Sequence, residues 1–500
     1  MNKLSLLKKG LPYFLVIIAG ACTPFAFSPI HFYLFALLTP AILFKVWQKS
    51  LPKEAFIQGL LFGISFFSIG VSWVFISIHE FGNTSIFIAS LLTFFFILVL
   101  AFFIGLQGYL YRRYFSQTSE ISSIMTFSAL WVIMEWVRSG IFSGFPWLIL
   151  GYSQIHSALS GYIPILGEYG VSFLLTLSSG LLILFFSNKK RFLIASIFFM
   201  IWLSGFALSK IEWTKPKNLK WYKVALLQGD IPQELKWNPD YLNNTLKTYL
   251  ELTRQHLTTD IIIWPESAIP TAYQYVNDFL IALNEEAKAN NIALIVGIPS
   301  IANQKTNFED HYYNGLFTFG KGSGSYFKRH LVPFGEYLPL KKLLHGLIAF
   351  FDIPMSDFIP GKMAQEKLKL KDLSAASFIC YEIAYPEIVR YQIDTADLLI
   401  TISNDSWFGN SLAPWQHLEI GQFRALQTGR YMLFASNSGV TAIINPKGII
   451  TKIIPQFKTA VLTGEIQAMV GITPWMKIGS LPIIFLLFLN LLFIKLKNKR

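Results

Sequence analysis

The sequence predicts a multi-span α-helical membrane domain joined to an external α/β sandwich domain, in which helices cover mixed sheets. Three observations predict this fold class. Residues 1–210 and 478–494 contain long apolar runs, and a hydrocarbon core about 30 Å thick needs roughly 20 apolar residues per helix. Residues 215–470 have ordinary globular composition, with short apolar runs that alternate with amphipathic helical patterns. Lys and Arg gather in one alternating set of the short loops, which sets the orientation of membrane proteins.

Composition excludes several other classes of protein. The 500 residues are 53% hydrophobic and only 14% charged, which is too apolar and too poor in charge for a soluble protein. Two cysteines, Cys22 and Cys380, exclude both a disulfide framework and a cysteine-based zinc site. The chain has neither an HExxH nor a CxxC motif and its eight His are scattered, so the sequence implies no metal and no cofactor.

We expect three parts along the chain. Residues 1–210 would form a membrane domain with about seven transmembrane helices, residues 211–473 the external domain, and residues 474–500 a C-terminal transmembrane helix with a basic tail. The seven candidate segments are about 11–28, 30–46, 56–78, 86–111, 122–138, 164–187 and 192–209. The second is short and the fifth contains Glu135, so their signals are weaker. The first could be mistaken for a signal peptide, but another apolar segment follows it immediately.

The charges of the short loops predict the orientation of these helices. One set of helix ends carries fifteen Lys and Arg and two Glu, whereas the alternate loops around 29, 79–85 and 139–163 carry essentially none beyond Arg138 at a helix end. Both termini are therefore expected in the cytoplasm, with residues 210–477 on the far side as one translocated domain. The same helix ends account for the whole net charge of +13. The excess of basic residues therefore reflects the orientation of the helices in the membrane, which argues against nucleic acid as a partner.

The loop after the fifth candidate helix is rich in Gly and aromatic residues. It begins at Glu135 and Arg138, three residues apart on one helix face, and continues through Gly144-Phe145-Pro146-Trp147 to Gln154. Two interpretations stay open. The loop is either an interfacial aromatic belt or a structured vestibule beneath the external domain, because ionisable residues near membrane depth are often functional.

Strands and helices alternate through the external domain, which indicates mixed sheets covered by helices. Strands are predicted at Val224–Gln228, Ile261–Trp264, Ala293–Ile298, Ala375–Ile379, Leu398–Ile402, Leu433–Ser436, Thr441–Asn445 and Ala460–Ile466, with a hairpin from Asn314–Phe319 to Gly324–Phe327. Helices are predicted at Pro239–His256, Val276–Asn290, Pro386–Gln392 and Trp415–Tyr431.

Three titratable residues each follow a predicted strand, namely Glu266, Lys328 and Cys380. Active sites in α/β sheets gather at the carboxyl ends of strands, so these side chains can converge. Together they form a coherent set, in which a carboxylate takes the thiol proton, the thiolate attacks a carbonyl, and an ammonium stabilises the oxyanion. Each residue taken singly also has a structural alternative. Glu266 could be a neighbour of a helix N-cap, Lys328 a solvated hairpin residue, and Cys380 a buried core cysteine.

The motifs around these residues resemble a known family. Trp264-Pro265-Glu266, Lys328-x-His-Leu-Val-Pro-Phe-Gly-Glu336 and Ile379-Cys-Tyr-Glu382 are similar to the Glu-Lys-Cys motifs of the nitrilase superfamily, whose domain is an αββα sandwich. With its multi-span N-terminal half and C-terminal span, the chain resembles the apolipoprotein N-acyltransferase family from end to end. The Gly-Phe-Pro-Trp loop, Asn404–Phe408 and Arg424–Arg430 also look like that family.

The resemblance implies a two-step acyl transfer in lipoprotein biosynthesis. Cys380 would take an acyl chain from a phospholipid as a thioester, and the α-amino group of a diacylglyceryl-modified apolipoprotein would then attack it. Glu266 would be the base and Lys328 the oxyanion partner, and the family pattern gives supporting roles to the residues Trp237, Glu336, Tyr381 and Glu382. The family also implies a multi-pass protein of the bacterial inner membrane, with the catalytic domain on the periplasmic side.

Two rival functions remain open. A membrane-tethered nitrilase-type amidase acting on a small soluble amide would need one anchoring helix, so eight argue against it. A transporter with an external binding domain usually has paired halves and interrupted helices, and no such duplication is visible in the sequence.

A short apolar segment lies between the second and third of the motifs. Leu343–Phe351, followed by Asp352–Met355, is too short to span a bilayer. It is either a short core helix or a membrane-dipping arm over 343–355 that admits acyl chains to the thiol.

Overall fold

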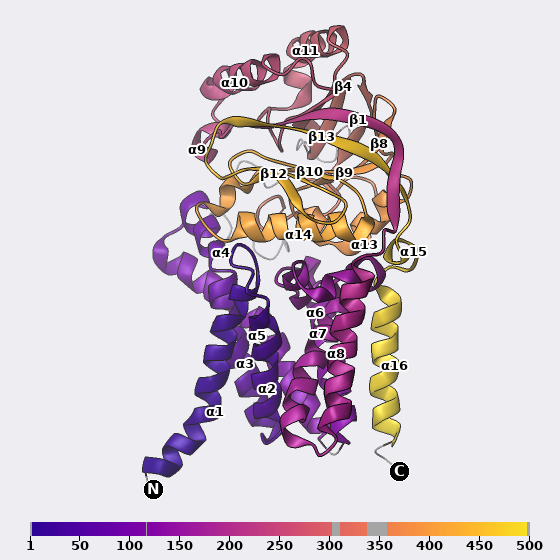
Figure 1. Ribbon diagram of the computed structural model, residues 1–500. Helices are drawn as coiled ribbons and strands as arrows, with labels where there is room; N and C mark the ends of the chain where they lie inside the picture. Colours follow the sequence, from indigo (N-terminus) through magenta and orange to yellow (C-terminus); the bar gives the residue numbers. More distant parts are fainter. Residues whose placement is uncertain (1–2, 117, 303–310, 338–357, 498–500) are drawn as a thin grey trace. The chain divides into compact units, whose positions relative to one another are not determined.

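The computed structural model describes residues 3–116, 118–302, 311–337 and 358–497. The chain forms two compact units, which we name the helical unit (Met1–Phe75, Ile86–Glu212 and Lys477–Arg500) and the sheet unit (Ile76–Ser85 and Trp213–Met476). Figure 1 labels their helices and strands. The proposed arm over 343–355 lies outside the described residues.

A helix occupies each of the eight segments that the sequence marks as apolar. The helices are α1 (Lys3–Cys22), α2 (Leu34–Trp47), α3 (Pro52–Gly70), α5 (Ile86–Tyr114), α6 (Glu120–Arg138), α7 (Ile163–Ser187), α8 (Arg191–Leu208) and α16 (Leu481–Lys497). By length and hydropathy, four helices among the described residues can cross a membrane. A fifth can do so if α3 forms one span with Trp73–Phe81, a segment that begins with α4 (Trp73–Ile76) and is bent by 56° from α3. Eight spans therefore stay a prediction.

Small residues let the helices of this unit approach closely. A Cβ added to Gly63 on α3 would lie 2.6 Å from the Cα of Ala101 on α5, so only glycine fits at this crossing. Many large apolar side chains of the unit also lie on its outer surface. On α8, Phe192 is 84% exposed and Leu203 is 69% exposed, which only an apolar surrounding makes favourable. The protein is membrane-associated.

Buried polar side chains fix the Gly-rich loop after α6. The carboxylate of Glu135 accepts hydrogen bonds from the indole of Trp131 (3.0 Å) and from the backbone N–H of Leu150 (2.9 Å). One nitrogen of Arg138 donates to the carbonyls of Phe145 and Trp147, at 2.7 and 2.8 Å. These contacts give the loop a defined backbone, which favours a structured loop over a simple aromatic belt.

The sheet unit contains two sheets packed face to face. The first sheet has the strand order β13-β1-β2-β3-β4-β6 and the second β12-β11-β10-β9-β8-β7-β5. The strands are β1 (Thr214–Gln228), β2 (Ile261–Ile263), β3 (Ala293–Ile301), β4 (Tyr312–Gly320), β5 (Gly322–Ser323), β6 (Ser325–Phe327), β7 (Leu368–Leu370), β8 (Leu373–Ile379), β9 (Leu398–Ser403), β10 (Met432–Ser436), β11 (Thr441–Ile444), β12 (Ile450–Ile454) and β13 (Ala460–Gly471).

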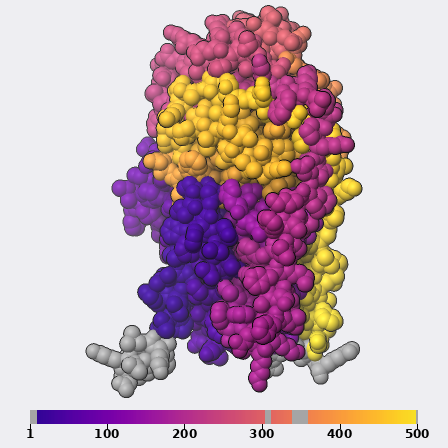
Figure 2. Space-filling model, in the orientation of Figure 1, coloured from indigo at the N-terminus to yellow at the C-terminus, as the bar shows by residue number. Residues whose placement is uncertain are grey.

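Helices cover the outer faces of both sheets (Figure 1). Helices α10 (Leu242–Arg254) and α11 (Asn277–Ala289) share a buried apolar cluster with the outer face of the first sheet. Helices α13 (Pro386–Ile393) and α14 (Ala413–Thr428) cover the second sheet. A separate cluster fills the space between the two sheets, and it includes the strand residues that precede the site. On the face seen in Figure 2, atoms of the C-terminal strands (yellow) form a continuous surface over the sandwich.

The observed elements refine the predicted ones in three places. Strand β1 begins at Thr214, ten residues before the predicted start, because antiparallel pairing with β13 continues across a bulge into its exposed polar part. Strands β7 and β12 were not predicted, since each is short and partly exposed. The hairpin of β4 with β6 is present, but β5 between them pairs with β7 and joins the other sheet.

The segment Ile76–Ser85 packs with the sheet unit although it lies between two long helices in the sequence. The hydroxyl of Ser77 donates to the carbonyl of Trp407 at 2.7 Å, and the rings of Phe81 and Trp407 meet edge to face at 5.8 Å. This contact covers the turn η10 (Asp405–Phe408) that follows β9.

Candidate active site

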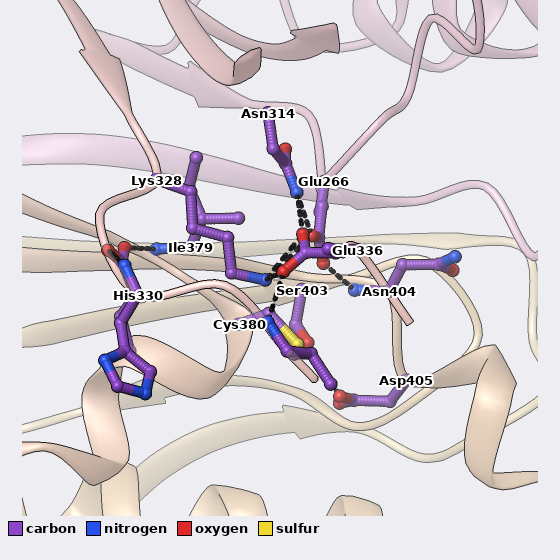
Figure 3. A network of polar contacts seen from close by, with 12 residues as sticks. Glu266, Asn314, Lys328, His330, Glu336, Ile379, Cys380, Ser403, Asn404 and Asp405 are labelled. Atoms are coloured by element: carbon purple, nitrogen blue, oxygen red, sulfur yellow. Dashed lines mark hydrogen bonds and ion pairs between the residues drawn. The ribbon is translucent and has the colours of Figure 1, made fainter. Parts of the chain in front are cut away.

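Each residue of the predicted set lies within three residues of the end of a strand. Glu266 follows β2, Lys328 follows β6, and Cys380 opens the 3₁₀ turn η9 (Cys380–Ala384) immediately after β8. The strands β2 and β6 belong to one sheet and β8 to the other, so packing of the two sheets is what lets these ends meet. Figure 3 shows the side chains of all three pointing toward one another.

Lys328 is a buried cation held by two carboxylates. Its side chain is 1% exposed, and its Nζ lies 2.9 Å from Glu336 Oε2 and 3.7 Å from Glu266 Oε1. Burial opposes the charged form, but the two carboxylates outweigh it and raise the pKa of Lys328 above its usual value. The side chain is therefore a permanent ammonium in the centre of the site.

The carboxylate of Glu266 is oriented by amide groups. Asn314 Nδ2 donates to Glu266 Oε1 at 2.7 Å and to Glu336 Oε1 at 2.8 Å, so one amide fixes the spacing of the two carboxylates. The backbone N–H of Asn404 donates to Glu266 Oε2 at 2.8 Å. These donors and the ammonium of Lys328 hold the carboxylate in one direction (Figure 3).

Cys380 sits on a strained turn. Its φ is +54°, a left-handed conformation that costs a non-glycine residue about 1 kcal/mol or more. Burial raises the pKa of the Cys380 thiol well above its usual range, the carboxylate of Glu266 raises it further, and the ammonium of Lys328 opposes both. At neutral pH the resting side chain is therefore a thiol, and it needs a base to become a nucleophile.

Glu382 ties this turn to the segment that carries the ammonium. Its buried carboxylate accepts hydrogen bonds from the backbone N–H groups of Ile379 (2.8 Å), Arg329 (2.6 Å) and His330 (3.2 Å) and from the hydroxyl of Tyr326. Burial raises the pKa of Glu382, and the backbone donors oppose that rise. The role of Glu382 in the structure is therefore to join the two backbone segments.

The remaining predicted residues are Tyr381, which follows Cys380 in the sequence, and Trp237, which follows Lys236. The ring of Tyr381 meets that of Tyr385 edge to face at 5.1 Å. Trp237 follows the short helix α9 (Gln233–Lys236), and its indole N–H is buried with no hydrogen-bond partner in the described part of the chain.

Sequence reasoning missed several polar residues of the site. Lys236 is 1% exposed, and its Nζ donates to the backbone carbonyl of Glu266 at 3.1 Å. Burial lowers the pKa of Lys236 to about 7, against the opposing effect of Glu266. Asn314 could have been found, because it is a polar residue at the start of a predicted apolar strand. No local pattern marks Lys236, which lies in a short charged helix.

Comparison with known proteins identifies the family of the chain. The carbon-nitrogen hydrolase family matches residues 223–474, and the apolipoprotein N-acyltransferase N-terminal domain family matches residues 19–181. The apolipoprotein N-acyltransferase of Coxiella burnetii is 44% identical over 482 residues, which cover 96% of this chain and 98% of the relative. The chain belongs to the apolipoprotein N-acyltransferase family.

Further relatives carry the same name. The apolipoprotein N-acyltransferase of Azotobacter vinelandii is 40% identical over 94% of this chain and 92% of its own. That of Methylococcus capsulatus is 40% identical over 94% of this chain and 93% of its own. The resemblance inferred from the motifs is thereby confirmed, and so is the fold class, a carbon-nitrogen hydrolase sandwich joined to several apolar helices.

Proposed function

We propose that this protein transfers an acyl chain from a phospholipid to the N-terminal diacylglyceryl-cysteine of an apolipoprotein, through a thioester on Cys380. The observation that carries the proposal is the grouping of a buried ammonium, an oriented carboxylate and a thiol on a strained turn. Membership of the apolipoprotein N-acyltransferase family supports the choice of substrates.

In the first step, Glu266 takes the proton of the Cys380 thiol, and the sulfur attacks the ester carbonyl of the phospholipid. The carbonyl oxygen becomes an oxyanion, which the ammonium of Lys328 stabilises. The carbon–oxygen bond then breaks, and the leaving alkoxide takes the proton from Glu266. The products are a thioester and a lysophospholipid.

In the second step, the α-amino group of the modified apolipoprotein attacks the thioester carbonyl. Glu266 now takes a proton from the amine, the carbon–sulfur bond breaks, and Glu266 returns that proton to the leaving thiolate of Cys380. Because the protonated carboxyl and the carboxylate alternate, one group serves both steps. Glu336 supports the site by holding the Lys328 ammonium at 2.9 Å.

The helical unit fits substrates that are themselves anchored in lipid. Both the acyl donor and the modified apolipoprotein carry acyl chains that cannot leave a bilayer cheaply. We place the protein in the bacterial inner membrane, with the sheet unit on the periplasmic side. Support comes from the gathering of Lys and Arg in one alternating set of short loops.

Intact-mass measurement of the purified protein tests the proposal. Mixing with phospholipid should add the mass of one acyl chain and release lysophospholipid, and a diacylglyceryl-cysteine peptide should then remove the adduct. Cys380→Ser should form no adduct, whereas Cys22→Ser, which removes the other cysteine, should react like the wild type. Transfer by Cys380→Ser within about tenfold of wild type, a barrier change of only about 1.4 kcal/mol, would rule out the thioester.

The rival amidase function predicts a different result. A tethered amidase would hydrolyse a small amide without releasing lysophospholipid from vesicles. Ammonia release from short amides, with no acyl adduct on phospholipid, would therefore favour the amidase.

A further inference from the structure

A second polar network lies on the other side of Cys380 from Lys328 and the two carboxylates. It consists of Ser403 at the end of β9, Asp405 in the following turn, and His417 on α14. Asp405 and His417 are each 1% exposed. Figure 3 shows Asp405 across Cys380 from Lys328, Glu266 and Glu336. None of these three residues has a role in the proposed chemistry.

The imidazole of His417 bridges two groups. Its Nδ1 lies 3.0 Å from Asp405 Oδ1, and its Nε2 lies 3.1 Å from the backbone carbonyl oxygen of Cys380. A carbonyl oxygen can only accept a hydrogen bond, so Nε2 must carry a proton. The tautomer is therefore set by the partners, and His417 is a donor to Cys380.

Other donors hold Asp405 in place. The hydroxyls of Ser403 and Ser436 donate to its two oxygens at 2.6 and 3.2 Å. Asp405 therefore accepts a hydrogen bond at each of its carboxylate oxygens, which holds its side chain against His417.

The hydrogen bond from His417 helps to hold the strained turn at Cys380. Glu382 holds the backbone N–H of Ile379 at 2.8 Å, just before the thiol-bearing residue, and His417 holds the carbonyl just after its Cα. The left-handed φ of Cys380 persists only if its surroundings impose it. His417 holds the peptide group that follows Cys380, and Glu382 holds the backbone one peptide group further upstream, at the N–H of Ile379, so the two hydrogen bonds restrain the turn on both sides of the thiol-bearing residue.

We propose that His417, oriented by Asp405, is a positioning residue that holds the Cys380 peptide so that the sulfur faces Glu266. This inference rests on the proposed thioester chemistry. His417 acts through the backbone and touches no substrate. Its loss should therefore slow acylation without weakening phospholipid binding.

Two substitutions separate the two nitrogens of His417. The amide nitrogen of Gln lies as many bonds from Cα as Nε2, so His417→Gln keeps a donor toward Cys380. The amide nitrogen of Asn matches Nδ1, so His417→Asn keeps the contact with Asp405 and loses the contact with Cys380. His256→Asn, at a partly exposed histidine outside the network, controls for the substitution itself.

The measurements are the rate of acyl-adduct formation on phospholipid vesicles, its dependence on phospholipid concentration, and the rate of Cys380 alkylation by iodoacetamide, followed by peptide mass mapping. His417→Asn should lower the maximal acylation rate about a hundredfold with unchanged half-saturation, because a small displacement of a reacting atom costs that much. His417→Gln should stay within about tenfold of wild type. Alkylation should follow the same order, with the Gln variant faster than the Asn variant.

Every outcome decides the question. Equal rates for the two variants, or a folded Gln variant that loses a hundredfold, would overturn the positioning role. A Gln variant that does not fold would assign the network to overall stability and would overturn it too. If only the Asn variant fails to fold, the rate of the Gln variant decides. If wild type forms no acyl adduct, the thioester proposal fails, and the alkylation rates still test His417.

Discussion

Replacement of Lys236 by methionine tests whether burial lowers the pKa of this lysine beside the candidate site. A lysine whose pKa falls from 10.5 to about 7 disfavours folding in its charged form by about 5 kcal/mol, at about 1.4 kcal/mol per pH unit. Methionine has similar length and no charge, so it removes this cost. It also removes the hydrogen bond to the carbonyl of Glu266, which costs about 2 kcal/mol. Lys236→Met should therefore stabilise the sheet unit by about 3 kcal/mol near pH 6.

The difference in stability between Lys236→Met and wild type depends on pH. Between about pH 7 and 10.5 the unfolded chain binds a proton at this lysine that the folded chain does not, so the stability of wild type rises with pH in this window. Below pH 7 both states are protonated and the full cost is present. Near pH 9.5 the remaining cost is about 1.4 kcal/mol, so the advantage of the methionine variant should vanish.

Thermal unfolding of the full chain in detergent, followed by tryptophan fluorescence, measures this difference. The midpoint of Lys236→Met should exceed that of wild type by about 6–12 °C near pH 6 and by about 0 °C near pH 9.5, at roughly 2–4 °C per kcal/mol. Lys247→Met is the matched control, because the side chain of Lys247 is 74% exposed and pairs only loosely with Glu251 at 3.9 Å. A midpoint difference that does not change with pH would refute the depressed pKa of Lys236.

Two further predictions concern the carboxylates of the site. Glu266→Gln should slow acyl-adduct formation by about 10²–10⁴-fold, because the thiol has a raised pKa and loses its base; adduct formation at the wild-type rate by mass spectrometry would exclude Glu266 as the base. Glu336→Gln should slow the same step by about tenfold or more and lower the thermal midpoint, because removing one partner of a buried ion pair leaves the ammonium under-compensated. Its control is Glu286→Gln, which breaks the exposed pair with Arg254 and should change neither quantity measurably; similar losses in both variants would contradict the argument.

Local sequence pattern was enough to find the strand ends that carry the site. Short apolar runs that stop at Glu266 and Cys380 mark buried strands, because burial on both faces requires apolar side chains at successive positions. The hairpin that ends before Lys328 was found from its glycines. The same reasoning placed all eight apolar helices, since a long apolar run has few other stable conformations. Short, partly exposed strands such as β12 escaped, because their burial pattern is weak.

The contacts that orient the site could not be read from the sequence. Asn314 lies 48 residues from Glu266, and the N–H of Asn404 lies 138 residues from it, yet both donate to the same carboxylate. These pairs meet because strand register and the packing of the two sheets place them together, and neither is a property of nearby residues. The hydrogen bond from His417 to the Cys380 carbonyl depends on how α14 lies across the second sheet. The sequence alone determined the helices, most of the strands and the reactive groups at their ends, since periodicity and burial are local, whereas the tertiary structure decided which groups face one another.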